Sequence, residues 1–230
     1  MIVYGRNAVR EALRGPRDVS AVWATERAAR ESWLGKAGAR IVDAAEIEAR
    51  CGSSAHQGVC AEASPYVYAE PAALLADPDP LIVALDEVTD PQNLGAVCRS
   101  AETAGATGVA VPRHRSADVT PAVCKASAGA VEHLAVARVR NLADFLGEAK
   151  RAGSWCYGTD ATASVPYDGP DFSGGVVVVL GSEGRGLRPR VASACDELLA
   201  IPVRGRVGSL NVSAAAAVLL YEIVQQRGKG

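Results

Sequence analysis

The sequence predicts an α/β protein made of two units, a small one at the N-terminus and a larger one built on a parallel sheet. Helix-like and strand-like segments alternate along the 230 residues. The run at residues 176–180 is apolar at every position, which is typical of a central parallel strand covered by helices on both faces. Prolines at 65, 71, 78 and 80 mark the connection between the two units.

The first unit is placed at residues 1–67. Its helical segments are expected at 7–14, 26–36 and 44–51, and its strands at 19–24, 39–42 and 58–61. Such alternation predicts a small α/β sandwich. Residues 68–80 combine prolines with three acids and no base, a composition typical of a linker, so a domain boundary is expected there.

The second unit is placed at residues 81–230. Short apolar runs predict strands at 81–85, 108–111, 134–139, 154–158, 176–180 and 198–203, and periodic segments predict helices at 93–104, 143–151 and 209–226. Ligands of parallel sheets bind beyond the carboxyl ends of the strands. Three polar motifs follow strand ends in this unit, so its candidate site is expected at that edge.

Composition excludes several classes of protein. With 49% apolar residues the chain is not disordered. The longest apolar stretch, residues 214–221, is far short of the roughly 20 residues that span a bilayer. The six cysteines form no C-x-x-C pair, so no metal site is expected, and reduced thiols in a cytoplasmic protein are the simplest interpretation. The net charge of −2 does not by itself indicate a nucleic-acid binder.

The first motif is a strand-to-helix turn at residues 86–99. Pro91 stops any earlier helix, and Asn93 is expected to be the N-cap of the next one. Gly95 would let a ligand approach the backbone closely. Arg99 follows Asn93 by six residues, about 240° around a helix, so the two converge only if Asn93 stands at the cap. Taken alone, the segment fits a capped helix with a surface arginine.

The second motif, Gly181-Ser182-Glu183-Gly184, directly follows the apolar run. Its glycines allow a tight turn with exposed amide groups, a shape suited to a nucleotide-like ligand. It matches neither the P-loop nor the dinucleotide-binding pattern, and taken alone it fits an ordinary turn. The Glu183 carboxylate is well placed to orient an arginine or a cationic ligand.

The third motif begins at Ile201-Pro202, where a strand is expected to end, and continues through a glycine-flanked loop to Ser209-Leu210-Asn211. Ser209 or Asn211 could simply cap the last helix. The small residues at 213–217 allow very close helix packing.

Together and in this order, the three motifs resemble the signature of the SpoU/TrmH-type RNA 2'-O-ribose methyltransferases, most closely the bacterial 23S rRNA guanosine-2'-O-methyltransferase subgroup. Residues 4–13 and 56–59 resemble the ends of the substrate-binding domain of these enzymes, which is similar to ribosomal protein L30e. The resemblance implies a trefoil-knotted SPOUT methyltransferase domain at 81–230 and an L30e-like RNA substrate-binding domain at 1–67. Apart from it, His56 fits a surface or satisfied histidine.

The resemblance also implies the site. Its catalytic residues would be Asn93, Arg99, Glu183, Ser209 and Asn211, and its cofactor, S-adenosylmethionine, would be held by the backbone around Gly181, Ile201 and Leu210. A guanidinium stays protonated, so Arg99 is expected to act as an electrostatic clamp on the ribose oxygen or its phosphate rather than as a base.

The implied partners are RNA of the large ribosomal subunit and a second copy of the chain bound through the C-terminal domain, with no DNA and no membrane. The N-terminal domain is expected to swing on the connector and grip RNA. Two alternatives stay open: a tRNA ribose methyltransferase, and a catalytically silent RNA-binding or ribosome assembly factor of the same fold.

Overall fold

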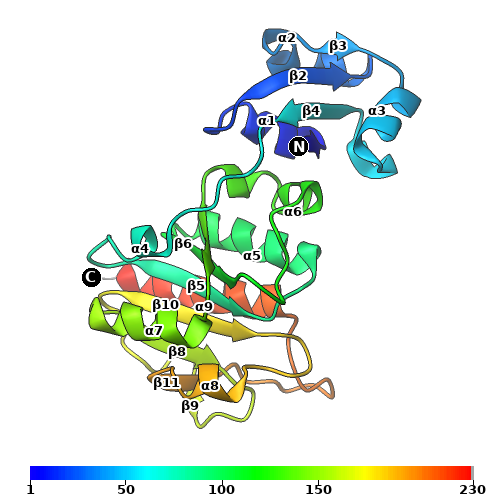
Figure 1. Cartoon of the computed structure of the whole chain (residues 1–230). Helices are drawn as coiled ribbons and strands as arrows, with labels where there is room; N and C mark the ends of the chain where they lie inside the picture. Colours follow the sequence, from blue (N-terminus) through cyan, green and yellow to red (C-terminus); the bar gives the residue numbers. More distant parts are fainter. Residues whose placement is uncertain (229–230) are drawn as a thin grey trace.

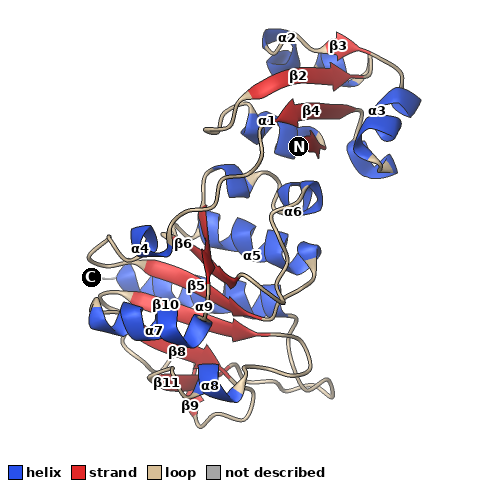
Figure 2. Cartoon of the chain, viewed as in Figure 1, coloured by secondary structure: helices blue, strands red, loops and turns tan. Residues whose placement is uncertain are grey.

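The computed structural model describes residues 1–228, which form a four-stranded and a seven-stranded sheet with helices packed around them (Figures 1 and 2). Within this part of the chain, none of the helices has the combination of length and apolar composition that crossing a membrane requires.

The N-terminal sheet has the strand order β1-β4-β2-β3. Its strands are β1 (Ile2–Tyr4), β2 (Val19–Ala24), β3 (Arg40–Ile41) and β4 (Val59–Ala63). The accompanying helical segments are α1 (Arg6–Ala12), η1 (Ala28–Arg30), α2 (Ser32–Lys36), α3 (Ala44–Cys51) and η2 (Ser54–His56). Strand β4 pairs antiparallel with β1 and β2.

Local sequence explains why α3 matches its predicted bounds and why other elements of this unit differ from the prediction. Helix α3 has the predicted bounds because Asp43 accepts a hydrogen bond from the amide of Glu46 and Gly52 takes the left-handed conformation that ends a helix. The helix expected at 26–36 is instead divided into η1 and α2, because Glu31 between them is extended. Strand β1 was not predicted, since three residues carry too little pattern.

The C-terminal sheet has the order β7-β6-β5-β10-β8-β11-β9, and every pair in it is parallel. Its strands are β5 (Leu81–Asp86), β6 (Gly108–Pro112), β7 (Ala135–Val139), β8 (Trp155–Thr159), β9 (Val165–Pro166), β10 (Val176–Gly181) and β11 (Glu197–Ala200). Strand β10 lies between β5 and β8, so the prediction of a central parallel strand at 176–180 is confirmed.

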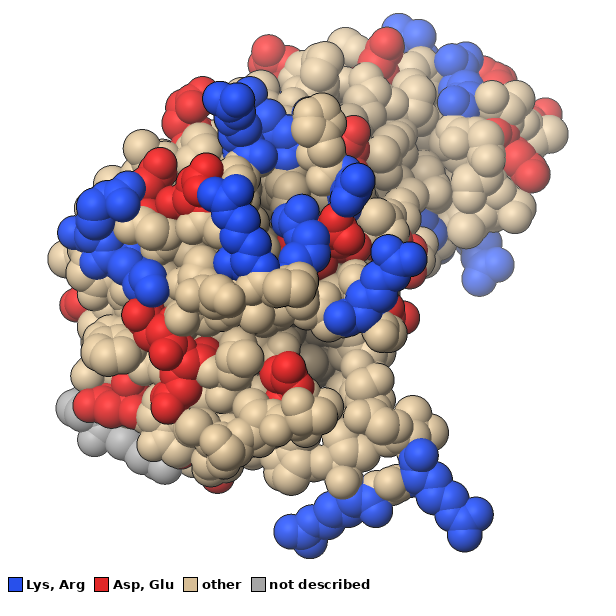
Figure 3. All heavy atoms as spheres, turned by 60° about the horizontal axis from the view of Figure 1, so that its bottom comes forward, with Lys and Arg blue, Asp and Glu red and all other residues tan. Residues whose placement is uncertain are grey.

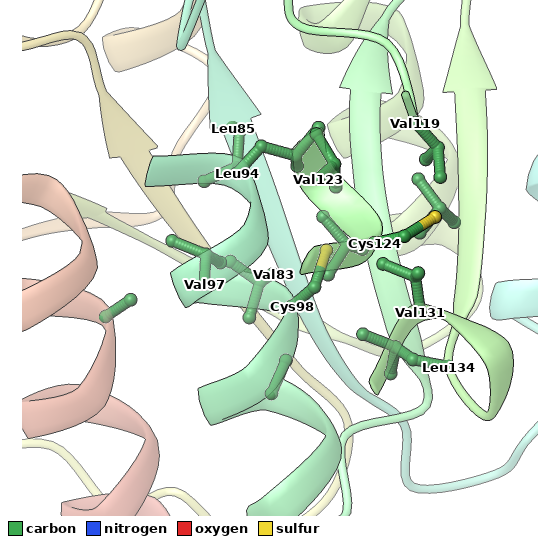
Figure 4. Packing of buried hydrophobic residues seen from close by; sticks show 14 of the residues in the cluster. Val83, Leu85, Leu94, Val97, Cys98, Val119, Val123, Cys124, Val131 and Leu134 are labelled. Atoms are coloured by element: carbon green, nitrogen blue, oxygen red, sulfur yellow. The ribbon is translucent and has the colours of Figure 1, made fainter. Parts of the chain in front are cut away.

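Helices cover both faces of this sheet (Figure 2). They are α4 (Pro71–Leu74), α5 (Pro91–Thr103), α6 (Pro121–Ala126), η3 (Ala130–Glu132), α7 (Leu142–Arg151), α8 (Pro189–Ala192) and α9 (Val212–Arg227). Successive strand residues face opposite sides. Val83 and Leu85 of β5 join the core beneath α5, seen in Figure 4, whereas Ile82 joins a second core with Phe145 of α7.

The two units are docked against each other. Arg17 and Glu132, both buried, form an ion pair in which Arg17 Nε donates to Glu132 Oε2 at 2.8 Å. Burial alone would lower the pKa of Arg17, but the hydrogen bond and charge of Glu132 raise it overall. The connecting segment packs too, because the Ala69 amide bonds to the carbonyl of Val136 at 2.9 Å. The expected free swing of the N-terminal unit is therefore wrong.

The six cysteines are free thiols. Cys60, Cys98, Cys124 and Cys156 are buried. Burial raises the pKa of Cys98 and Cys156 to about 12 and that of Cys60 and Cys124 to about 11. These thiols are therefore protonated near neutral pH and are unsuited to act as nucleophiles.

Candidate active site at the carboxyl edge of the large sheet

Three loops meet at the carboxyl edge of the seven-stranded sheet. They leave the ends of β5, β10 and β11, and each carries one of the three sequence motifs. Strands β5 and β10 are neighbours, with Asp86 opposite Gly181 in the register. The edge expected from the sequence therefore brings the motifs together.

Side chains from the three motifs form one hydrogen-bonded network. Asn93 Nδ2 donates to Glu183 Oε1 at 3.0 Å. Asn211 Nδ2 donates to Asn93 Oδ1 at 2.9 Å and also to Glu183 Oε1. The Glu183 carboxylate thus accepts hydrogen bonds from two side-chain amides, and these bonds hold the three motifs together.

Asn211 has a second role, because it is the N-cap of α9. Its Oδ1 accepts from the amide of Ser213 at 2.9 Å and from the Ser213 hydroxyl at 2.6 Å. With the oxygen committed to the cap, the amide nitrogen must face Asn93 and Glu183. The simple capping interpretation is correct for Asn211, and the same side chain also joins the network.

The expected N-cap at Asn93 is wrong. Helix α5 begins at Pro91, and the Asp90 side chain caps it by accepting from the Gln92 amide at 2.9 Å. Proline is favoured in the first turn of a helix, where its missing amide hydrogen is not needed. Because it does not cap, Asn93 is free to reach Glu183.

Gly95 serves packing rather than ligand access. It is buried in α5, and a Cβ there would lie 2.4 Å from the Cβ of Ala126 in α6. The missing side chain therefore admits a neighbouring helix, and the expectation that a ligand approaches at this position is wrong.

Two expected site residues stand apart from the network. Arg99 is exposed on α5, and within residues 1–228 its side chain makes no hydrogen bond or ion pair. Since Asn93 is already helical, six residues place Arg99 on a different face of α5. Ser209 is also exposed and lines the cavity described next.

A cavity of about 350 Å³ opens beside the network. Its walls include all three positions expected to hold a cofactor, Gly181, Ile201 and Leu210, together with Glu183. Apolar side chains such as Leu180 and Leu199 form much of the remainder. The lining therefore combines apolar side chains with polar and charged ones, among them Thr159, Asp160 and Arg185.

The loop after β10 folds back tightly on itself. The Gly186 amide donates to the carbonyl of Ser182 at 2.9 Å, and Gly184 and Gly186 have φ angles of 80° and 66°. A Cβ on Gly181 would lie 2.1 Å from the carbonyl carbon of Gly186. No side chain fits at position 181, so this glycine shapes the cavity wall.

Asp86 and Arg188 anchor the same loop and were missed by the sequence interpretation. The buried Asp86 carboxylate accepts from the backbone amide and from Nε of Arg188, both at 2.8 Å. The hydrogen bond to Asp86 raises the pKa of Arg188 despite partial burial. A carboxylate directly after the apolar strand 81–85 was the available signal, because buried charges require partners.

Comparison with known proteins adds independent findings. The family described as SpoU rRNA methylase matches residues 80–221, and the one described as RNA 2'-O ribose methyltransferase substrate binding matches residues 2–69. YacO of Bacillus subtilis, a putative TrmH family tRNA/rRNA methyltransferase, is 37% identical over 98% of this chain and 95% of its own. A tRNA/rRNA methyltransferase of Synechocystis is 38% identical over 99% of this chain, which spans 63% of that relative's length.

Solved structures agree with these relatives. The SpoU methyltransferase AviRb of Streptomyces viridochromogenes, in complex with the cofactor AdoMet, has a TM-score of 0.85 at 27% identity and covers 100% of this chain and 91% of its own. An AdoMet-bound rRNA methyltransferase of Sinorhizobium meliloti has a TM-score of 0.80 at 27% identity and covers 97% and 86%. A TrmH/SpoU tRNA-modifying enzyme of A. aeolicus has a TM-score of 0.60 at 26% identity and covers 69% and 80%.

Proposed function

Because the chain belongs to the SpoU rRNA methylase family, we propose that it transfers a methyl group from S-adenosylmethionine to a ribose 2'-oxygen of RNA. The observation that carries the proposal is the convergence of Asn93, Glu183 and Asn211 on one hydrogen-bonded network beside the cavity. A binding module that had lost catalysis would have no need to retain this network.

The cavity suits the proposed cofactor. Its volume of about 350 Å³ falls within the range of small-molecule sites, and the apolar side chains in its lining could pack against an adenine ring. Among residues 1–228, the amides of Ile201 and Leu210 have no hydrogen-bond partner, so both are available to a ligand. Gly181, Ile201 and Leu210 would thus hold the cofactor mainly by their backbone groups.

S-adenosylmethionine, when bound, supplies an electrophilic methyl group attached to a sulfonium. The chain would position the ribose 2'-oxygen in line with that group, so that the C–O bond would form as the methyl–sulfur bond breaks, S-adenosylhomocysteine would leave, and the 2'-hydroxyl proton would pass to phosphate or water. Positioning of this kind contributes much of such a rate enhancement. Glu183 would hold the side chains of Asn93 and Asn211 beside the bound ribose. Arg99, on another face of α5, would reach the developing alkoxide or the adjacent phosphate from outside the network, and Ser209 would add a hydroxyl at the cavity. No covalent enzyme intermediate is required.

We infer large-subunit rRNA as the substrate from two lines of support. Residues 4–13 and 56–59 resemble the ends of the family's substrate-binding domain, and N-terminal domains of this kind are commoner among its rRNA-modifying members. The structure named as an rRNA methyltransferase covers 97% of this chain, and the one named as a tRNA-modifying enzyme covers 69%. The N-terminal unit at residues 1–67 would bind this substrate, as its family match at 2–69 supports. The 2'-hydroxyl requirement excludes DNA.

We also propose that the C-terminal domain forms a homodimer through α9 and the adjoining face of α5. Tyr221 on α9 is 52% exposed, and its hydroxyl contacts Thr103 Oγ1 at 3.5 Å. Thr103 follows Arg99 by four residues, so both lie on the same side of α5. The pairing would cover Tyr221 and bring Arg99 close to the interface. Light scattering on the purified chain tests this, and a monomer would contradict it.

The test of the function is methyl transfer from labelled S-adenosylmethionine to transcripts of 23S rRNA and of tRNA, followed by mapping of 2'-O-methyl positions. We expect one labelled ribose in the 23S transcript. Labelling of tRNA alone would show that the substrate is tRNA rather than rRNA and would leave the proposed reaction unchanged. Cofactor binding without methylation of either RNA would favour the silent RNA-binding factor.

A further inference from the structure

The N-terminal unit contains a second cavity of about 460 Å³. It lies where the start of α1 meets the turn between η2 and β4, the two places whose sequences resemble a substrate-binding domain. The residues that line it are Arg6, Thr25, Arg27, Ala28, Ala44, His56, Gln57 and Gly58. The lining thus has two arginines and no carboxylate.

His56 presents an unused hydrogen-bond donor to this cavity. Its side chain is 92% buried, with only 8% of its surface exposed. The ring Nδ1 accepts from the Gly58 amide at 2.9 Å, which leaves the proton of the neutral ring on Nε2. Within residues 1–228, Nε2 has no hydrogen-bond partner. Because His56 lines the cavity, this donor is available to a ligand there.

Arg6 provides a second unused donor. Its Nε atom is buried and has no partner among the described residues, while one terminal nitrogen pairs with Glu31 at 3.0 Å. Arg27 is exposed at the cavity wall and adds a second guanidinium.

Gln57 is a further residue of the cavity lining, and its backbone conformation is uncommon. Its φ angle is 56°, in the left-handed region that residues other than glycine rarely adopt. Its Oε1 accepts from the Arg6 amide at 2.9 Å, so the NH₂ group of the same side chain remains free to donate. Strained residues of this type are concentrated at binding sites.

We propose that this cavity binds a backbone phosphate of the substrate RNA. The inference deepens the proposed function and rests on it. The lining offers nitrogen donors and positive charge, whereas a base edge would present donors as well as acceptors. A phosphate only accepts, and arginine guanidinium groups match its geometry.

A phosphate contact at this cavity would help to position the RNA. Figure 3 shows basic and acidic side chains intermixed over the upper part of one face, with a mostly uncharged area below, and the net charge is −2. Because acidic side chains are mixed with the basic ones on this face and the net charge is negative, a few phosphate contacts at defined places must position the RNA. Such contacts fix where the protein lies along the RNA, and they do not recognise its sequence. Because the buried pair Arg17–Glu132 docks the N-terminal unit, the cavity is held at a set distance from the active site.

The test uses the full-length chain and a fluorescein-labelled transcript of the 23S rRNA fragment that it methylates. Variants Arg27→Met and His56→Phe remove one charge and one donor, and Arg30→Met, an exposed arginine outside the cavity, is the matched control. We expect Arg27→Met to raise the Kd for RNA roughly fivefold to tenfold and to reduce the slope of log K against log salt by about one.

His56→Phe should also weaken RNA binding, and Arg30→Met should leave both the Kd and the slope as in the wild type. In all three variants the affinity for S-adenosylmethionine, measured by calorimetry, should be unchanged. In methyl transfer, Arg27→Met should raise KM for RNA and leave kcat unaltered.

Wild-type RNA affinity in both Arg27→Met and His56→Phe would overturn the inference. So would competition by inorganic phosphate, at constant ionic strength, that responds to these variants while RNA binding does not. A wild-type chain that binds RNA in the expected, variant-sensitive way but transfers no methyl group would count against the proposed function alone.

Discussion

The side-chain amide of Asn211 donates to the side-chain oxygen of Asn93 at 2.9 Å, across 118 positions of the sequence. Asn93 lies in the first turn of α5, which follows β5, and Asn211 is the N-cap of α9. Glu183, in the loop after β10, accepts from both amides. A change in any one of these side chains therefore leaves the other two with unpaired polar groups, and their effects on activity should not be additive.

Arg99→Ala separates catalysis from stability. Arg99 is exposed and has no side-chain partner within residues 1–228, so its removal should change the free energy of unfolding by no more than about 0.5 kcal/mol. Methyl transfer should fall roughly 100-fold or more, because a contact specific to the transition state is lost. Single-turnover assays and denaturant unfolding measure the two effects.

Arg99→Lys should not restore activity, because a point charge cannot reproduce the planar fork of the guanidinium. Arg151→Ala, an exposed arginine at the end of α7, is the control and should be fully active. Near-normal turnover in Arg99→Ala or Arg99→Lys would remove Arg99 from the site.

Glu183→Gln and Glu183→Ala distinguish the charge of this residue from its role as an acceptor. A glutamine oxygen can still accept from Asn93 and Asn211, although hydrogen bonds to a neutral acceptor are about half as strong. We expect turnover to fall about tenfold in Glu183→Gln and roughly 100-fold in Glu183→Ala. The measurement is kcat at saturating RNA and cofactor. Equal activities of the two variants would show that the network does not orient the amides.

Gly181→Ala should disrupt cofactor binding. Its Cβ would lie 2.1 Å from the Gly186 carbonyl carbon, and the loop can yield only by moving its backbone. Overpacking of this kind costs about 1–3 kcal/mol, so the Kd for S-adenosylmethionine should rise roughly fivefold to 150-fold. Gly205→Ala, which has nothing within 4 Å of the added Cβ, is the matched control. Calorimetry that gives both variants wild-type affinity would separate this loop from the cofactor site.

Arg17→Met should destabilise the chain strongly, because it leaves the Glu132 carboxylate buried without its partner. Removing one member of a buried pair costs about 3–5 kcal/mol. The double variant Arg17→Met with Glu132→Leu should recover most of this loss, since an apolar pair of similar volume avoids the burial of a lone charge. Denaturant unfolding measures both. A double variant as unstable as the single one would show that the charge is not what the interface depends on.

Local pattern was enough to predict much of the fold. Every residue of 176–180 is apolar, and only a strand covered on both faces buries such a run completely. The bounds of α3 followed from a side-chain cap and a terminal glycine. Local rules failed at the start of α5, where Asp90 and Asn93 are both good caps and Pro91 was interpreted as an end rather than a first turn.

The candidate site was less accessible to such reasoning. Strand ends indicated the edge, but the partners of Glu183 depend on how three loops meet, which the resemblance supplied and the spacing did not. The anchor between Asp86 and Arg188 joins residues 102 positions apart. The pair Arg17–Glu132 joins residues 115 positions apart. Neither pairing leaves a periodic signal, because each depends on tertiary packing.

Reaction of the buried cysteines with a reagent measures how often the structure opens. Cys98 and Cys124 lie in the core beneath α5, seen in Figure 4, and their thiols are protonated near neutral pH because burial raises their pKa. An alkylating reagent reacts with the thiolate and must wait for the structure to open. When reclosing is faster than alkylation, the rate at which the reagent labels these two residues gives the population of the open form. No other probe has to be attached to the chain.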